Sequence, residues 1–162
     1  MKITFIQTGG TIDKDYPRIL KSYAFEISDP AVSRILPSVT PNFDYEIKSF
    51  IKKDSNDITE KDRQGLSRLC QKIKNKYIVI THGTDTMIET AKYLSKEVKE
   101  KVIVLTGSIK PERFSDTDAG FNIGTAVGAL PYIQTGVYVA MSGRVYPYNK
   151  CYKSKDCIFV EK

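Results

Sequence analysis

Threonines and glycines stand together at two places where a predicted strand ends. The first is Thr8-Gly9-Gly10-Thr11-Ile12, and the second is Thr81-His82-Gly83-Thr84-Asp85. An unactivated threonine hydroxyl is a poor nucleophile at neutral pH, so it needs a base or a hydrogen-bond relay. The second loop offers hydroxyls and a carboxylate within a few residues, which is the material for nucleophilic chemistry.

Simpler readings exist for both loops. The first could be an ordinary turn after a strand, in which two glycines free the backbone. Neither GxGxxG nor GxxxxGK[ST] is present, so nothing supports a phosphate or nucleotide site. In the second loop, Thr84 or Asp85 could cap the next helix, although capping would explain only one of the polar side chains. We expect His82 to orient its loop rather than to act as a base.

The elements that must position these loops alternate along the chain. Apolar strands are predicted at 2–7, 45–51, 77–80, 102–105 and 137–141, and helices at 30–36, 59–73, 85–97 and 120–130. Thr59 should begin its helix with Asp62 at the capping-box position, a shorter substitute for the usual Glu. Continuous Val/Ile runs separated by helices predict a doubly wound α/β fold, a mainly parallel sheet with helices on both faces in a flavodoxin- or Rossmann-like three-layer sandwich.

Such a sheet predicts where a ligand binds. Ligands of open parallel sheets lie beyond the carboxyl ends of the strands. Small polar residues follow four of the predicted strands, in 8–11, 53–56, 81–85 and 106–108. The segment after residue 141 joins them if it folds back to the same edge. The convergence of these strand ends predicts a functional site there.

Together the two threonine loops resemble the paired signature of the asparaginase/glutaminase family. The likeness continues through Val104-Leu105-Thr106-Gly107-Ser108, residues 122–127 and Val139-Ala140-Met141, and so covers nearly the whole chain. The resemblance implies an L-asparaginase: an amidohydrolase that converts L-asparagine into L-aspartate and ammonia through a threonine nucleophile and an acyl-enzyme, with no metal or organic cofactor.

The resemblance also implies roles for individual residues. Thr11 matches the first catalytic threonine, Thr84 the second, and Asp85 the carboxylate that also binds the substrate's α-ammonium group. Ser55 matches the serine that binds the α-carboxylate, and Asn56 stands where the family often has glutamine. Lys153 falls at the family's catalytic lysine. Gly10 and Gly83 belong to the substrate-binding loops, whose backbone N–H groups near Gly10 and Thr84 are suited to hold an oxyanion.

A tyrosine that activates the first threonine is also implied. Tyr23, in Ser22-Tyr23-Ala24-Phe25, fits the usual spacing better, whereas Tyr16 lies five residues beyond Thr11. Both remain candidates at this point, and either could instead be a packing aromatic, since the chain has 10 tyrosines.

Composition excludes several other classes of protein. The net charge of +6 comes from 25 basic and 19 acidic residues scattered along the chain, so no clustered nucleic-acid surface is expected. A single histidine, His82, and three cysteines leave few zinc ligands. The cysteines, Cys70, Cys151 and Cys157, are expected to be reduced. The chain has no run of 18 apolar residues, so no membrane span is predicted. The N-terminus reads as a strand rather than as a signal peptide, and we therefore predict a cytoplasmic protein.

The chain departs from the family pattern in its length. We expect residues 1–162 to form one domain of the family's N-terminal type, without the usual C-terminal domain. A homodimer or homotetramer would be one way to complete the site. Four aromatics near the C-terminus, Tyr146, Tyr148, Tyr152 and Phe159, could cover a partner or pack onto their own sheet. The alternative to an enzyme is an amino-acid-binding or regulatory module with a catalytically weak pocket. An amidase subunit acting on a larger acceptor, such as that of a tRNA amidotransferase, is least favoured.

Overall fold

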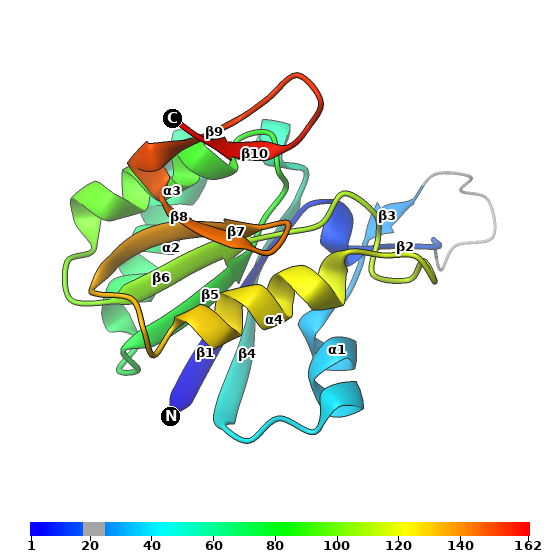
Figure 1. The fold of residues 1–162 in the computed structure, drawn as a ribbon, viewed down its shortest axis with the longest axis horizontal. Coiled ribbons are helices and arrows are strands. Elements are labelled where there is room, and N and C mark those ends of the chain that lie inside the picture. Colours follow the sequence, from blue (N-terminus) through cyan, green and yellow to red (C-terminus); the bar gives the residue numbers. More distant parts are fainter. Residues whose placement is uncertain (18–24) are drawn as a thin grey trace.

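A six-stranded sheet forms the centre of the molecule (Figure 1). The computed structural model describes residues 1–17 and 25–162. The spatial order is β4-β1-β5-β6-β7-β8, and every neighbouring pair is parallel except β7 and β8. The strands are β1 (Lys2–Gly9), β4 (Asp44–Lys53), β5 (Tyr77–Thr81), β6 (Val102–Thr106), β7 (Gly136–Met141) and β8 (Arg144–Pro147).

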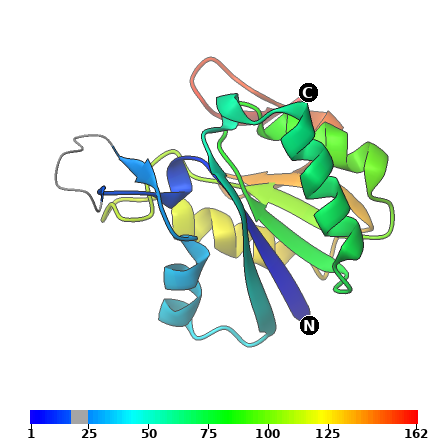
Figure 2. The same ribbon diagram turned by 180° about the vertical axis from the view of Figure 1, so that it is seen from behind.

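Helices cover both faces of this sheet (Figures 1 and 2). On one face lie α1 (Val32–Val39) and α4 (Ala119–Ala129). On the other lie α2 (Glu60–Lys72) and α3 (Met87–Glu97). The predicted doubly wound α/β fold is confirmed.

The apolar runs explain the two cores. In β5, Ile78 and Ile80 enter the core under α2 and α3, while Val79 enters the core under α1 and α4. A strand buried on both faces cannot alternate with polar residues, which is why these runs are continuous. The predicted capping box is present: the Thr59 side chain accepts from the Asp62 N–H, and the Asp62 carboxylate accepts from the Thr59 N–H.

One crossover has an unusual hand. The β5-α3-β6 and β6-α4-β7 units advance in the same direction across the sheet, yet α3 and α4 lie on opposite faces. The two crossovers therefore have opposite hands, whereas nearly all such units in parallel sheets are right-handed. The segment 107–118, which leads into α4, consequently passes over the carboxyl edge of the sheet toward α1.

The C-terminal segment folds back to the same edge. After β8 come a 3-10 turn η3 (Tyr148–Lys150) and a hairpin of β9 (Cys151–Lys153) and β10 (Phe159–Glu161). Tyr146 and Phe159 are buried in the chain's own core, while Tyr152 remains exposed. These short strands are absent from the sequence prediction, which followed the chain only to the strand at 137–141.

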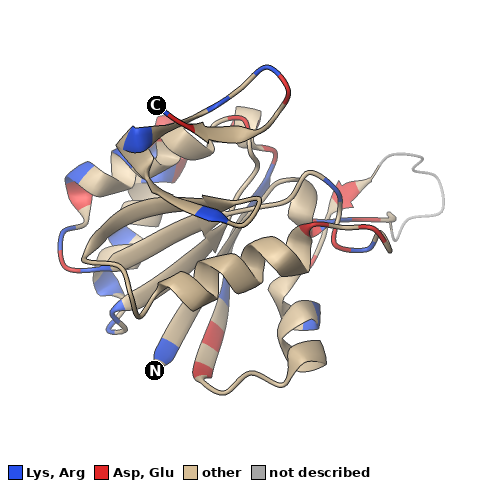
Figure 3. Ribbon diagram, in the orientation of Figure 1, with Lys and Arg blue, Asp and Glu red and all other residues tan. Residues whose placement is uncertain are grey.

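Smaller features complete the edge that carries the predicted site. They are the 3-10 turns η1 (Thr11–Asp13) and η2 (Ser55–Asp57) and the short antiparallel pair β2 (Lys14–Asp15) and β3 (Glu26–Ile27). The three cysteines are free thiols. Basic and acidic residues are interspersed over the helices and loops (Figure 3). Among the described residues, no helix combines the length and the apolar character that crossing a membrane needs.

Candidate active site

Glycines allow the predicted site loops to touch through their backbones. Gly10 has φ 85°, and a Cβ there would lie 2.3 Å from the Gly83 nitrogen. A Cβ at Gly83 would lie 2.7 Å from the Cβ and Oγ of Ser55. Only glycine permits this approach. The contacts bring the loops of Thr11, Thr84 and Ser55 to one place at the carboxyl edge of the sheet.

A lysine from the C-terminal hairpin reaches the second threonine loop. The Lys153 Nζ donates to Thr84 Oγ1 at 2.8 Å and lies 2.5 Å from Asp85 Oδ1. The Lys153 side chain is mostly buried, whereas that of Asp85 is 53% exposed. An ammonium group held against a hydroxyl oxygen stabilises negative charge that develops on that oxygen.

Asp85 is held from two sides. Its Oδ2 accepts a hydrogen bond of 3.1 Å from the Asn56 side-chain amide, and its Oδ1 faces Lys153. The hydrogen bond from Lys153, with that from Asn56, lowers the pKa of Asp85 below its usual value of 3.8 despite some desolvation. Asp85 is therefore a carboxylate at neutral pH, and half of its surface is open to a cation.

Helix capping does not occupy these polar groups. The residue at the N-cap of α3 is Thr86, and it makes no side-chain cap. Its hydroxyl instead donates to the Ser55 carbonyl oxygen at 2.6 Å. The simpler alternative, in which Thr84 or Asp85 caps the helix, does not hold, and both side chains contact Lys153 instead.

His82 holds its own loop, as predicted. It is completely buried, with Nδ1 2.7 Å from the Gly83 carbonyl oxygen and Nε2 2.9 Å from Thr90 Oγ1. Arg63 Nε also donates to Thr90 Oγ1, so that oxygen accepts from Arg63 and its proton is available to Nε2. This arrangement assigns the proton of the neutral imidazole to Nδ1. Burial lowers the pKa of His82 to about 4, so it carries no charge at neutral pH.

The first threonine loop turns sharply after β1. The Gly10 N–H donates to the Lys53 carbonyl oxygen at 3.0 Å, so in this structure that amide is occupied rather than aimed at an oxyanion. Thr11 follows at the start of η1 and is half-buried. The Thr8 hydroxyl donates to the Thr81 carbonyl oxygen at 2.8 Å, which ties the ends of β1 and β5 together.

The two candidate tyrosines differ in what the structure says of them. Tyr16 is 74% exposed, and its ring centroid lies 5.0 Å from that of Phe25. Within residues 1–17 and 25–162, the ring contact of Tyr16 is with Phe25 and not with either threonine loop. Tyr23 lies outside the described residues.

Sequence reasoning missed one buried acid beside the site. Asp13 lies two residues after Thr11 and is fully buried. Its position in a polar turn gave no sign of burial, which depends on packing against α1 and β5. A separate groove of about 490 Å³ lies between α1 and α4, lined by Ile35, Val39, Gly120, Gly124 and Val127 among others, and contains neither candidate threonine.

Known proteins resemble this chain along nearly its whole length. The family model described as asparaginase, N-terminal, matches residues 2–157. A probable periplasmic L-asparaginase of Haemophilus influenzae is 31% identical over 153 residues, covering 88% of this chain and 43% of that protein. A glutaminase-asparaginase of Acinetobacter glutaminasificans is 30% identical over 155 residues, covering 89% of this chain and 47% of that protein.

The solved structures agree. The thermostable L-asparaginase from Thermococcus kodakarensis superposes with a TM-score of 0.84 at 26% identity, covering 99% of this chain and 51% of that chain. The present chain thus spans about half the length of the relatives it matches.

Proposed function

Since this chain belongs to the asparaginase family, whose N-terminal domain it matches over residues 2–157, we propose that it is an amidohydrolase acting on L-asparagine. The observation that carries the proposal is the contact of Lys153 with both Thr84 and Asp85, on a loop that touches the Thr11 loop. A hydroxyl held against an ammonium group, which in turn contacts a carboxylate, is an arrangement that can activate a weak nucleophile.

The proposed reaction has two stages. The Thr11 Oγ1 attacks the side-chain amide carbon, the C–N bond breaks, and ammonia leaves with the proton that the hydroxyl has lost. Water then hydrolyses the resulting ester, which releases L-aspartate and restores the threonine. We assign to Thr84, supported by the Lys153 ammonium, the role of second catalytic threonine, whose hydroxyl relays a proton between the reacting groups, and to Tyr16 or Tyr23 the activation of Thr11.

Substrate recognition is assigned to the open side of the same edge. The Asp85 carboxylate suits the α-ammonium group of an amino acid, and the Ser55 hydroxyl suits its α-carboxylate. Asn56 fixes Asp85 through the 3.1 Å hydrogen bond. Gly10 and Gly83 are assigned to the substrate-binding loops, because their lack of a side chain lets these loops pack against each other and against Ser55.

Ammonia release tests this function. Purified protein is incubated with millimolar L-asparagine, with L-glutamine in parallel, beside the variants Thr11→Ala and Thr84→Ala. We expect the parent protein to release ammonia from asparagine, and each variant to lower the rate at least about a hundredfold. Thr11→Ala removes the hydroxyl that bonds to the reacting carbon, and Thr84→Ala removes the hydroxyl that relays a proton. The control is Thr125→Ala, whose hydroxyl donates to Phe121 within α4 and which should keep full activity.

Two results would reject the assignment. Full activity in both threonine variants would show that neither threonine is the nucleophile. Stoichiometric binding of asparagine by folded protein without ammonia release would indicate the amino-acid-binding module instead. The glutamine arm measures specificity, which a pocket usually sets at about 1–3 kcal/mol for one methylene.

We further propose that residues 1–162 act as one domain, in a cytoplasmic homodimer or homotetramer. The half-exposed Asp85 supports a site that a second subunit covers. Light scattering over a range of protein concentrations tests the assembly: a constant monomer mass would reject it. Fractionation of the source cells tests the compartment.

A further inference from the structure

Asp13 is a buried carboxyl group that the proposed reaction does not use. Its Oδ1 accepts from the Ala31 N–H at 2.7 Å, and its Oδ2 accepts from the Thr81 hydroxyl at 3.3 Å. The Gln7 side chain is a third hydrogen-bond partner. The Asp13 carbonyl oxygen also accepts from the Ser28 N–H at 2.9 Å. Every one of these contacts joins η1 to another segment of the chain.

These partners stand at points that define the site. Ala31 is the residue from which α1 starts, and Thr81 is the last residue of β5, directly before the loop that carries Thr84. Asp13 itself ends the turn that Thr11 begins. One carboxylate therefore connects the turn of the first threonine to the strand end of the second.

We propose that Asp13 is a positioning residue, whose carboxylate holds the Thr11 turn against β5 and α1 and thereby sets Thr11 relative to the Thr84 loop. This proposal rests on the proposed function. Thr11 and Thr84 belong to different loops, and a displacement of about 1 Å between reacting groups is enough to lower an enzymatic rate a hundredfold.

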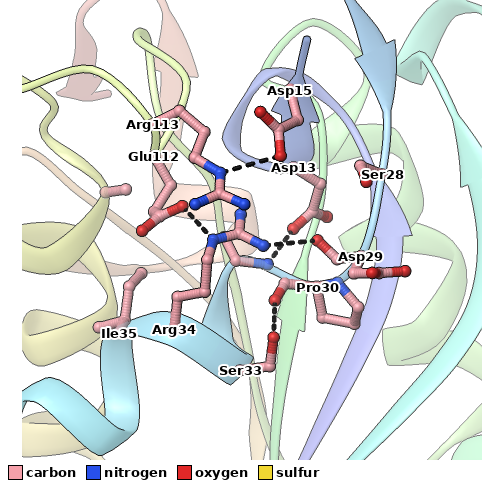
Figure 4. Close-up of polar contacts among 12 residues, drawn as sticks. Asp13, Asp15, Ser28, Asp29, Pro30, Ser33, Arg34, Ile35, Glu112 and Arg113 are labelled. Carbon is pink, nitrogen blue, oxygen red and sulfur yellow. Dashed lines mark hydrogen bonds and ion pairs between the residues drawn. The ribbon is translucent and has the colours of Figure 1, made fainter. Parts of the chain in front are cut away.

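The surroundings of Asp13 make its charge state matter. Arg34 of α1 is a charged side chain that acts on Asp13, and the same close-up holds Asp15 of β2, Asp29 before α1, and Glu112 and Arg113 of the segment after β6 (Figure 4). Arg34 donates to Glu112 Oε2 at 2.6 Å and Arg113 to Asp15 Oδ2 at 2.9 Å, so each arginine has a carboxylate other than Asp13. Burial outweighs the hydrogen bonds and the Arg34 charge, and raises the pKa of Asp13 to about 6.

Protonation of Asp13 would remove part of its hydrogen bonding. An ionised carboxylate accepts at both oxygens, whereas a protonated one presents an O–H on one side. That O–H would meet groups that donate to the carboxylate in the structure, so at least one contact has to break or reverse. The Thr11 turn should then loosen as the pH falls through about 6.

The test compares Asp13→Asn with Glu46→Gln across pH 5 to 8. The side chain introduced by Asp13→Asn has nearly the same shape as the aspartate side chain, but it keeps only one acceptor oxygen and does not titrate. Glu46 is a matched control, because it also accepts from a strand threonine, Thr4, at 2.8 Å, but near the opposite end of the sheet. We measure kcat and KM for asparagine, and follow the Gly10 and Thr11 amides by NMR.

For the parent protein we expect kcat to fall below pH about 6 with little change in KM, and the Gly10 and Thr11 amides to shift with the same midpoint. In Asp13→Asn, kcat at pH 8 should be about 10- to 100-fold lower, KM unchanged, and both the acidic limb and the amide midpoint absent. Glu46→Gln should reproduce the parent in every respect.

The outcomes separate this proposal from the function. An active Asp13→Asn variant with the parent's kcat and acidic limb overturns the positioning role and leaves the amidohydrolase standing. If the parent protein releases no ammonia, the proposed amidohydrolase function is rejected, and the NMR shifts of the Gly10 and Thr11 amides alone test the role of Asp13. A shared midpoint that vanishes in the variant supports the coupling of Asp13 to the turn, and amides that do not titrate overturn it.

Discussion

At the scale of single residues, the position of Lys153 matters most for the proposed chemistry. It lies 69 residues beyond Thr84 in the chain, yet its Nζ contacts both Thr84 and Asp85. The Lys153 ammonium group lies against the Asp85 carboxylate and acts on the Thr84 hydroxyl through charge and hydrogen bonding. Without the Lys153 ammonium group, the Thr84 oxygen would lose the cation that stabilises negative charge developing on it.

The first prediction follows from this contact. Lys153→Met keeps much of the side chain's apolar length but removes the ammonium, so kcat for ammonia release should fall about 10²- to 10³-fold. Lys153→Arg should recover only part of the rate, because the planar guanidinium cannot replace a compact ammonium. Lys155→Met, on the exposed turn of the same hairpin, is the control and should match the parent. Equal rates for Lys153→Met and its control would contradict the role.

Residues differ in how far the sequence could reveal them. Thr84 and Asp85 stand in a dense polar loop, so their types and spacing mark them as candidates, whereas the role of Thr11 came from the resemblance. Lys153 came only from the resemblance, because no local pattern marks a lysine that acts across 69 residues. Asp13 was missed because its burial arises from the packing of α1 and β5 around a turn that reads as polar.

At the scale of elements, the main sheet could be predicted and the connections could not. Continuous runs such as Ile78–Ile80 require burial on both faces, which fixes a strand covered by helices. The strands β8, β9 and β10 are three or four residues long and have no such run. The hand of the β6-α4-β7 crossover has no local sequence signal either. The segment of this crossover before α4 nevertheless places Glu112 against Arg34 of α1.

The second prediction concerns the close approach of the loops. In Gly83→Ala the new Cβ would lie 2.7 Å from the Ser55 side chain, and the resulting crowding should lower the free energy of unfolding by about 1–3 kcal/mol. Gly124→Ala is the matched control, since a Cβ there meets nothing within 4 Å inside α4. It should raise the free energy of unfolding by about 0.5–1 kcal/mol, because alanine favours helix. Urea unfolding measures both, and equal stability of the two variants would disprove the close packing.

At the scale of the whole molecule, two buried groups act on stability in opposite directions. The folded pKa of Asp13 is raised from 3.8 to about 6, so the folded state binds its proton first and stability rises as the pH falls through about 6. The folded pKa of His82 is lowered from 6.5 to about 4, so the unfolded state binds that proton first and stability falls below pH 6.5. Each contributes a slope of about 1.4 kcal/mol per pH unit, with opposite sign.

The third prediction is that these slopes nearly cancel between pH 6 and 4.5, and that single variants expose them. Below that window the depressed carboxyls, among them Asp62 with a pKa of about 2, begin to titrate and would confuse the reading. Asp13→Asn leaves only the histidine, so its free energy of unfolding should fall by about 1.4 kcal/mol per unit on acidification. His82→Asn, which keeps a donor toward the Gly83 carbonyl, leaves only the aspartate, so its free energy of unfolding should rise by the same slope. Urea unfolding at half-unit pH intervals measures both.

Parallel profiles for the two variants would mean that neither group is buried as the structure has it. Divergent profiles around a flat parent profile would show that Asp13, near Thr11, and His82, near Thr84, have opposite and nearly equal effects on the pH dependence of stability.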